Sequence, residues 1–113
     1  MKIAFPVADG KLCAHFGHCQ FFALVEVNTE AKSVIKTEML SPPAHEPGVL
    51  PKWLSEQGAN LIIAGGMGMR AQQFFQQYNI NVVVGVNSMF TPEELALNYI
   101  NNTLEIGDNI CDH

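Results

Sequence analysis

Four residues of types that commonly bind metals fall within seven positions of the sequence: Cys13, His15, His18 and Cys19. Thiolate and imidazole groups suit zinc, Cu(I) and iron–sulfur centres. Gly17 lets the backbone between them fold tightly. Their spacing matches neither a zinc finger nor a ferredoxin, so it predicts a metal site without naming the metal. The alternative is that the cysteines are small core residues and the histidines are surface residues.

A fifth candidate ligand, His45, lies in a segment that contains three prolines and extends from Ser41 to Gly48. Prolines stiffen the segment, so His45 would lose little conformational entropy on binding a metal. The alternative is an ordinary exposed loop histidine. Cys111 and His113 could add ligands at the C-terminus, but chain ends are often disordered, which favours no role for them.

The segment Gly65-Gly66-Met67-Gly68-Met69-Arg70 joins a predicted strand to a predicted helix. Ligands of open α/β sheets bind beyond the carboxyl ends of strands, and helix N-termini there attract anions. The segment is neither a Walker A motif nor a dinucleotide-binding G-x-G-x-x-G motif. Arg70 falls in the first helical turn, where the helix dipole disfavours a cation by roughly 0.3–1 kcal/mol. A bound anion would reverse that cost; the alternative is that the glycines serve only the turn.

The elements that must position these residues follow from hydrophobic periodicity and turn signals. Strands are expected at 2–7, 21–27 and 34–39, with a loop at 11–19. A helix is then expected, with Pro51 in its first turn and Gly58 at its end. The remaining expected elements are a strand at 61–64, a helix through Ala71, Phe74, Phe75 and Tyr78, a strand at 82–84 and a helix at about 92–101.

Strands joined by a hairpin pair antiparallel, and strands joined by helices pair parallel. The chain is therefore expected to form one α/β domain over residues 1–113, with a mixed sheet of about five strands and helices on its faces. The tail at 103–113 shows no regular period. Trp53 and the aromatic residues of the second helix are expected in the core, and Met67 and Met69 are expected to pack rather than bind metal.

Composition excludes several classes of function. The net charge is −5, with six Lys and Arg against eleven Asp and Glu, so a nucleic-acid partner is not expected. No apolar run reaches the roughly 20 residues of a membrane helix, and no secretory signal is visible. A cytoplasmic protein with reduced cysteines is expected, and no membrane partner.

Three segments together resemble the dinitrogenase iron–molybdenum cofactor biosynthesis family, over residues 3–99. They are His15-Phe16-Gly17-His18-Cys19, Pro42-Pro43-Ala44-His45-Glu46-Pro47-Gly48 and Gly65-Gly66-Met67-Gly68-Met69-Arg70-Ala71. The resemblance implies a ribonuclease-H-like three-layer fold. It also implies non-catalytic binding or delivery of an anionic metal–sulfur cluster, of Fe–Mo–S or Mo–Cu–S type, with cluster-assembly or acceptor proteins as partners. It does not fix which cysteines or histidines are ligands.

Three hypotheses follow. The first is a cluster carrier, with metal ligands among Cys13, His15, His18, Cys19 and His45 and with residues 65–70 balancing the cluster's charge. The second is an interaction or regulatory module with a simple zinc site or no metal. The third is a nuclease; it is least favoured, because such enzymes need clustered carboxylates to hold metal ions and the first strand has none. Asp9 lies in the turn after that strand.

Overall fold

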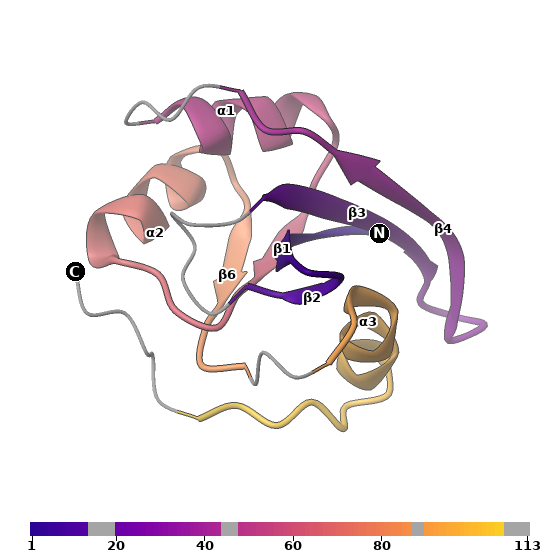
Figure 1. The fold of residues 1–113 in the computed structure, drawn as a ribbon. Coiled ribbons are helices and arrows are strands. Elements are labelled where there is room, and N and C mark those ends of the chain that lie inside the picture. The colour runs from indigo at the N-terminus through magenta and orange to yellow at the C-terminus, as the bar shows by residue number, and fades with distance from the viewer. Residues whose placement is uncertain (14–19, 44–47, 87–89, 108–113) are drawn as a thin grey trace.

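The structure is a computed structural model that describes residues 1–13, 20–43, 48–86 and 90–107 (Figure 1). A six-stranded sheet and three helices make up these residues. The elements in chain order are β1 Lys2–Ala8, β2 Lys11–Leu12, β3 Phe21–Asn28, β4 Ser33–Leu40, α1 Val49–Glu56, β5 Leu61–Ile63, α2 Met69–Gln77, β6 Asn81–Val83 and α3 Pro92–Ile100.

The sheet has the strand order β4-β3-β1-β5-β6, with β2 paired to the end of β1. The hairpin strands pair antiparallel: β3 lies between β1 and β4, with Val7 opposite Phe21 and Phe22 opposite Leu40. The strands joined by helices pair parallel, β1 with β5 and β5 with β6. This mixed topology confirms the arrangement expected from the order of elements.

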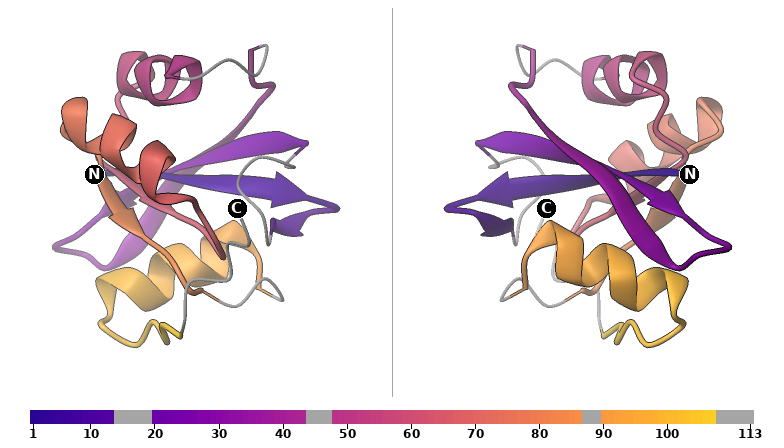
Figure 2. Two further views of the ribbon diagram at one scale, coloured as in Figure 1. Left: turned by 90° about the vertical axis from the view of Figure 1, so that its left-hand side faces the viewer. Right: turned by 90° about the vertical axis from the view of Figure 1, so that its right-hand side faces the viewer.

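Helices cover both faces of the sheet, so the molecule has three layers (Figure 2). Side chains of β1 alternate between the two resulting cores. Ile3, Phe5 and Val7 pack with Leu95 of α3 on one face, in a cluster of fully or nearly buried residues. Ala4 lies on the other face, in the cluster formed under α1 and α2. The three-layer fold implied by the family resemblance is thus confirmed. In the described residues, no helix is long and apolar enough to cross a membrane.

The expected loop at 11–19 was wrong at its start, where Lys11–Leu12 forms β2. β2 is the second arm of a tight hairpin, with Ala8 opposite Lys11. Its two turn residues, Asp9 and Gly10, both have positive φ, 55° and 79°. Two such residues match a type I′ turn, for which Asp-Gly is a favoured sequence. The Asp-Gly pair was therefore a hairpin signal.

Two further expectations need correction. Helix α1 begins at Val49, two residues before Pro51, with Gly48 as its N-cap. Tyr78 is 38% exposed rather than in the core, whereas Phe75 is fully buried. Tyr78 follows the last turn of α2 with φ −99° and ψ 13°, so it no longer continues the buried face of the helix.

Candidate functional site

Four strands end at the same edge of the sheet. β1, β5 and β6 run parallel, and β4 runs in the same direction because both it and β1 are antiparallel to β3. Their last residues are Ala8, Leu40, Ile63 and Val83. We call this edge the rim. Ligands of open α/β sheets bind at this kind of edge, beyond the carboxyl ends of the strands.

The glycine-rich segment leaves the rim directly after β5. Backbone pairing continues past the strands, because Gly85 N–H donates to Gly65 O at 2.9 Å. Gly65, Gly66 and Met67 are buried, while Met69 is 68% exposed and Arg70 is exposed. The expected packing role thus holds for Met67 and is wrong for Met69, whose position at the start of α2 turns it outward.

The N-terminus of α2 has no side-chain cap. Gly68 is the N-cap in an extended conformation, and no acidic residue lies in the first turn. Arg70 occupies that turn, as predicted from the sequence. The first N–H groups of a helix have no partner within the helix, and together with the helix dipole they favour a nearby anion. This end of α2 therefore offers backbone donors and a guanidinium group to a ligand.

Helix α1 also begins without a side-chain cap. Its N-cap is Gly48 with φ 82°, and no acidic residue lies in its first turn. A Cβ at Gly48 would lie 3.5 Å from the ring of Phe74, so the start of α1 is close to α2. Sequence reasoning did not identify this second open N-terminus, although Gly48 directly before an apolar run was a signal for it.

The Cys/His segment is attached to the rim at both ends. Cys13 N–H donates to Pro6 O at 2.8 Å, and Gln20 N–H donates to Val7 O at 2.9 Å. Both acceptors lie near the carboxyl end of β1. Cys13 is 7% exposed, which fits the reading of a small core residue as well as that of an inward-facing ligand. His15, His18 and Cys19 lie outside the described residues.

The other predicted ligands also lie outside the described residues, but their neighbours can be placed. His45 falls between Pro43, which follows β4, and Gly48 at the start of α1. The tail with Cys111 and His113 follows Gly107, whose N–H donates to Gly85 O at 2.7 Å at the rim. Within residues 1–13, 20–43, 48–86 and 90–107, no three Cys, His, Asp or Glu side chains come together in a metal-binding group.

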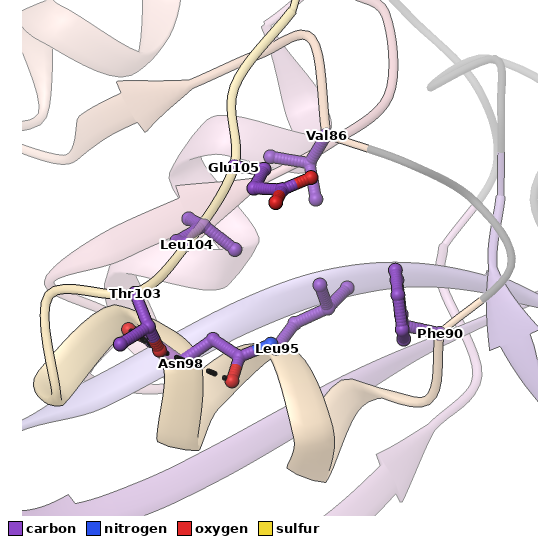
Figure 3. Close-up of a pocket in the computed structure, with 7 residues that line it drawn as sticks. All are labelled: Val86, Phe90, Leu95, Asn98, Thr103, Leu104 and Glu105. Atoms are coloured by element: carbon purple, nitrogen blue, oxygen red, sulfur yellow. Dashed lines mark hydrogen bonds between the residues drawn. The ribbon is translucent and has the colours of Figure 1, made fainter.

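A hollow of about 160 Å³ lies between α3 and the chain that follows it (Figure 3). The hydroxyl of Thr103 lies 3.3 Å from both the backbone oxygen and the side-chain oxygen of Asn98 at one side of the hollow. None of the residues predicted to bind a ligand lines it. Its lining is formed by Val86, Phe90, Leu95, Asn98, Thr103, Leu104 and Glu105.

Comparison with known proteins identifies the family of this chain. The profile described as "Dinitrogenase iron-molybdenum cofactor" matches residues 1–102. The chain belongs to this family. A relative from Methanocaldococcus jannaschii, uncharacterized protein MJ0580, is 29% identical over 85 residues, which are 73% of this chain and 72% of the relative.

Solved structures share the fold of this family member. The crystal structure of PH0822 superposes with a TM-score of 0.82 at 27% identity, covering 95% of this chain and 96% of the other. The apo form of the orange protein from Desulfovibrio gigas gives a TM-score of 0.72 at 20% identity, covering 96% and 93%. At that identity the likeness to the orange protein shows the fold alone.

Proposed function

We propose that this protein binds an anionic metal–sulfur cluster at the rim and carries it without transforming it. The observation that carries the proposal is the open N-terminus of α2, with Arg70 in its first turn, at the edge where the Cys/His segment is attached. Membership of a family named after the iron–molybdenum cofactor of dinitrogenase supports a cofactor-related ligand.

The charges at the rim favour a negatively charged ligand. The N–H groups at the start of α2, which have no partner within the helix, carry partial positive charge, and Arg70 adds a full one. Successive backbone N–H groups form concave sites for anions at many phosphate and iron–sulfur centres. In this proposal Gly65, Gly66, Met67, Gly68 and Met69 supply backbone contacts, and Arg70 pairs with the cluster's charge.

Soft donors would hold the metal itself. Cys19, His15 and His18 are the first choice, because thiolate and imidazole groups bind Fe, Mo and Cu in sulfur-rich clusters. Cys13 and His45 are the second choice, since Cys13 is nearly inaccessible and His45 belongs to a separate segment. Clusters of Fe–Mo–S and Mo–Cu–S type both suit this set of donors, so the proposal includes both.

A carrier needs a partner that supplies the cluster and one that receives it. We propose cluster-assembly and acceptor proteins in these roles, in the cytoplasm, where thiols stay reduced. No chemical transformation is proposed at the rim. The proposed ligands and the anion-binding turn are binding groups, and together they account for capture and release.

Anaerobic reconstitution tests the proposal. The purified protein is incubated with iron and sulfide, or with thiomolybdate and copper, and then desalted and analysed for metal and visible absorption. We expect bound metal with sulfide-to-metal charge-transfer bands. A protein that stays colourless and metal-free under both conditions contradicts the proposal.

Variants assign the result to the rim. The triple change His15→Ala, His18→Ala and Cys19→Ala should abolish metal retention, and Arg70→Gln should weaken it. Lys52→Gln is the matched control, because it removes an exposed cation from α1 that is not among the proposed ligand-binding residues. Tetrahedral zinc without visible absorption in the native protein would instead favour the alternative, a small interaction module with a zinc site.

A further inference from the structure

The outer strand β4 is long and uncovered along its free edge. It spans eight residues, Ser33–Leu40, and pairs only with β3 within the described residues. Figure 2 shows it as the outermost strand in the right-hand view, with no described element in front of it. The opposite edge differs: β6 has three residues, and the chain beyond it is bridged by Val86 and Ile106. Long open edges favour pairing with another strand.

Side chains on β4 are arranged so that a second copy of the strand would complement them. Lys36 and Glu38 are two residues apart on one face, 61% and 42% exposed, with Nζ and Oε1 at 3.0 Å. Ile35 and Met39, two large apolar residues, are 57% and 53% exposed. Thr37 lies at the centre of both pairs. The sequence Ile35-Lys36-Thr37-Glu38-Met39 therefore has matched partners on either side of Thr37.

We propose that two copies of this chain pair through β4 in antiparallel fashion, about a twofold axis at Thr37. In this register Lys36 faces Glu38 of the second copy, Ile35 faces Met39, and Thr37 faces Thr37. Cross-strand pairs of opposite charge, of apolar residues and of two threonines all stabilise antiparallel strands. A closed twofold interface uses the same surface on both subunits, and here both copies contribute β4.

Neighbouring registers are disfavoured by charge. A twofold axis perpendicular to the sheet places opposed side chains on the same face of the joined sheet. Alternative registers therefore differ by moving this axis along β4 in steps of one residue. An axis at Lys36 would place two lysines opposite each other, and an axis at Glu38 would place two glutamates opposite each other. Directly opposed like charges are destabilising. Only the axis at Thr37 pairs each charge with its opposite.

A β-bulge limits the length of the pairing. The register of β3 with β4 shifts between the Glu26–Lys36 and Val27–Val34 pairs, so Ile35 is the extra residue. Bulges bend a strand and locally disrupt its ladder, which resumes here at the Val27–Val34 pair. The uninterrupted part of the ladder thus runs from Lys36 to Leu40, and the bulged residue Ile35 is the first residue of the self-complementary stretch. The bulge and the charges together define one short interface and disfavour open-ended association of strands.

This pairing goes beyond the proposed function and leaves the rim accessible. The twofold axis reverses the strand direction in the second copy, so the two rims face opposite ends of the joined sheet. Each rim keeps its own α2 N-terminus and Arg70. Metal binding and pairing through β4 are therefore separate properties, and failure of one in experiment does not decide the other.

Sedimentation velocity and light scattering of the native protein provide the first test. We expect a concentration-dependent equilibrium between monomer and dimer. Lys36→Glu and Glu38→Lys should each raise the dimer dissociation constant by at least about tenfold, because each places like charges opposite each other twice. Lys52→Glu is the matched control, since it makes the same charge reversal on exposed α1 and should leave the constant unchanged.

Mixing the two variants gives the decisive test. The Lys36→Glu chain is acidic at positions 36 and 38, and the Glu38→Lys chain is basic at both. Pairing one with the other restores opposite charges across the axis at Thr37. The mixture should form a heterodimer, detected by native mass spectrometry, at concentrations at which each variant alone is monomeric. Circular dichroism and thermal unfolding establish that both variants fold. A native protein that stays monomeric at all concentrations, single variants that dimerise as well as the native chain, or a mixture that stays monomeric overturns the proposal.

Discussion

Helices α2 and α3 both begin near the rim, and their N-termini are built in opposite ways. In α3, the Thr91 side chain accepts from Glu94 N–H, and the Glu94 carboxylate accepts from Thr91 N–H, which forms a capping box. Glu93 and Glu94 also place negative charge in its first turn. In α2, Gly68 offers no side-chain cap, and the first turn carries Arg70 and no acid.

The difference shows which helix has donors to offer. In the first turn of α3, Pro92 has no N–H and Glu94 N–H is bound by Thr91, and the carboxylates of the helix balance its dipole, so it has less to give a ligand. Among the described residues no side chain caps the donors of α2, and its one charged side chain in that turn has the sign that a bound anion would compensate. We therefore expect changes at the start of α3 to affect mainly stability, and changes at the start of α2 to affect mainly ligand binding.

The largest expected effect comes from removing the anchor of α2. Phe75 is fully buried between α2 and the sheet. Phe75→Ala should lower the free energy of unfolding by about 3–5 kcal/mol, because a large buried ring leaves a cavity. Tyr78→Ala is the matched control, since 38% of Tyr78 is already exposed and its loss should cost much less. Urea unfolding of both variants measures the difference, and equal losses would contradict the structure.

Loss of the α3 cap should have the next largest effect. Thr91→Ala removes the side-chain acceptor for Glu94 N–H, which lies at 3.3 Å, and should cost about 1 kcal/mol in the free energy of unfolding. Metal retention in the reconstitution assay should not change, because α3 offers its donors to its own residues. A Thr91→Ala protein with native stability but without metal would reverse the roles assigned to the two helices.

Arg70 should affect the two properties in opposite directions. Arg70→Gln removes a cation from a helix N-terminus, so the free energy of unfolding should rise, by about 0.3–1 kcal/mol at low ionic strength. Metal–sulfur cluster retention should fall in the same protein. Arg70→Lys keeps the charge and is the control for both measurements. If Arg70→Gln binds clusters as well as the native protein, the guanidinium group has no part in the site.

A cap placed on α2 should compete with the ligand. Gly68 has φ −65° and ψ 154°, the extended conformation in which an N-cap aspartate can accept from the backbone of the first turn. Gly68→Asp should change stability by only a few tenths of a kcal/mol and should weaken cluster retention. Gly68→Ala adds a side chain without an acceptor or charge and separates steric from electrostatic effects. Equal weakening by both changes would point to crowding rather than to occupied donors.

The pH dependence of Glu94 is the smallest effect and concerns α3 alone. Hydrogen bonds from the backbone and the side chain of Thr91 lower the pKa of Glu94 from its ordinary value of 4.5. A lowered pKa in the folded state means that this contribution is present above pH 4.5 and is lost as the pH falls below it. NMR titration should find the pKa of Glu94 closer to 4.5 in Thr91→Ala than in the native protein.

Much of the fold was predictable because local signals agreed with the final arrangement. The capping box at Thr91 predicted the start of α3. The order of hairpin and helix connections predicted the mixed sheet. β2 was missed because two residues are too short for a hydrophobic period, although the Asp9-Gly10 turn marked it. Tyr78 is exposed because α2 ends at Gln77. The i+7 spacing of Tyr78 from Ala71 does not indicate where the helix ends.

The candidate site was predictable in part. The position of Arg70 in the first turn of α2 followed from strand–glycine–helix order and is confirmed. The roles of His15, His18, Cys19 and His45 stay predictions, because donor identity depends on side-chain geometry that spacing does not determine. The open N-terminus of α1 at Gly48 was not expected, since the helix was placed to start at Pro51.

The attachment of the Cys/His segment has a consequence for how this scaffold can change. Cys13 and Gln20 are fastened to neighbouring carbonyls of one strand, those of Pro6 and Val7. The two fixed points are set by β1, not by the sequence between them. Residues 14–19 can therefore be exchanged as a unit. If they hold the metal as proposed, grafting the corresponding stretch of a relative should transfer its metal preference while the recipient sheet keeps its register.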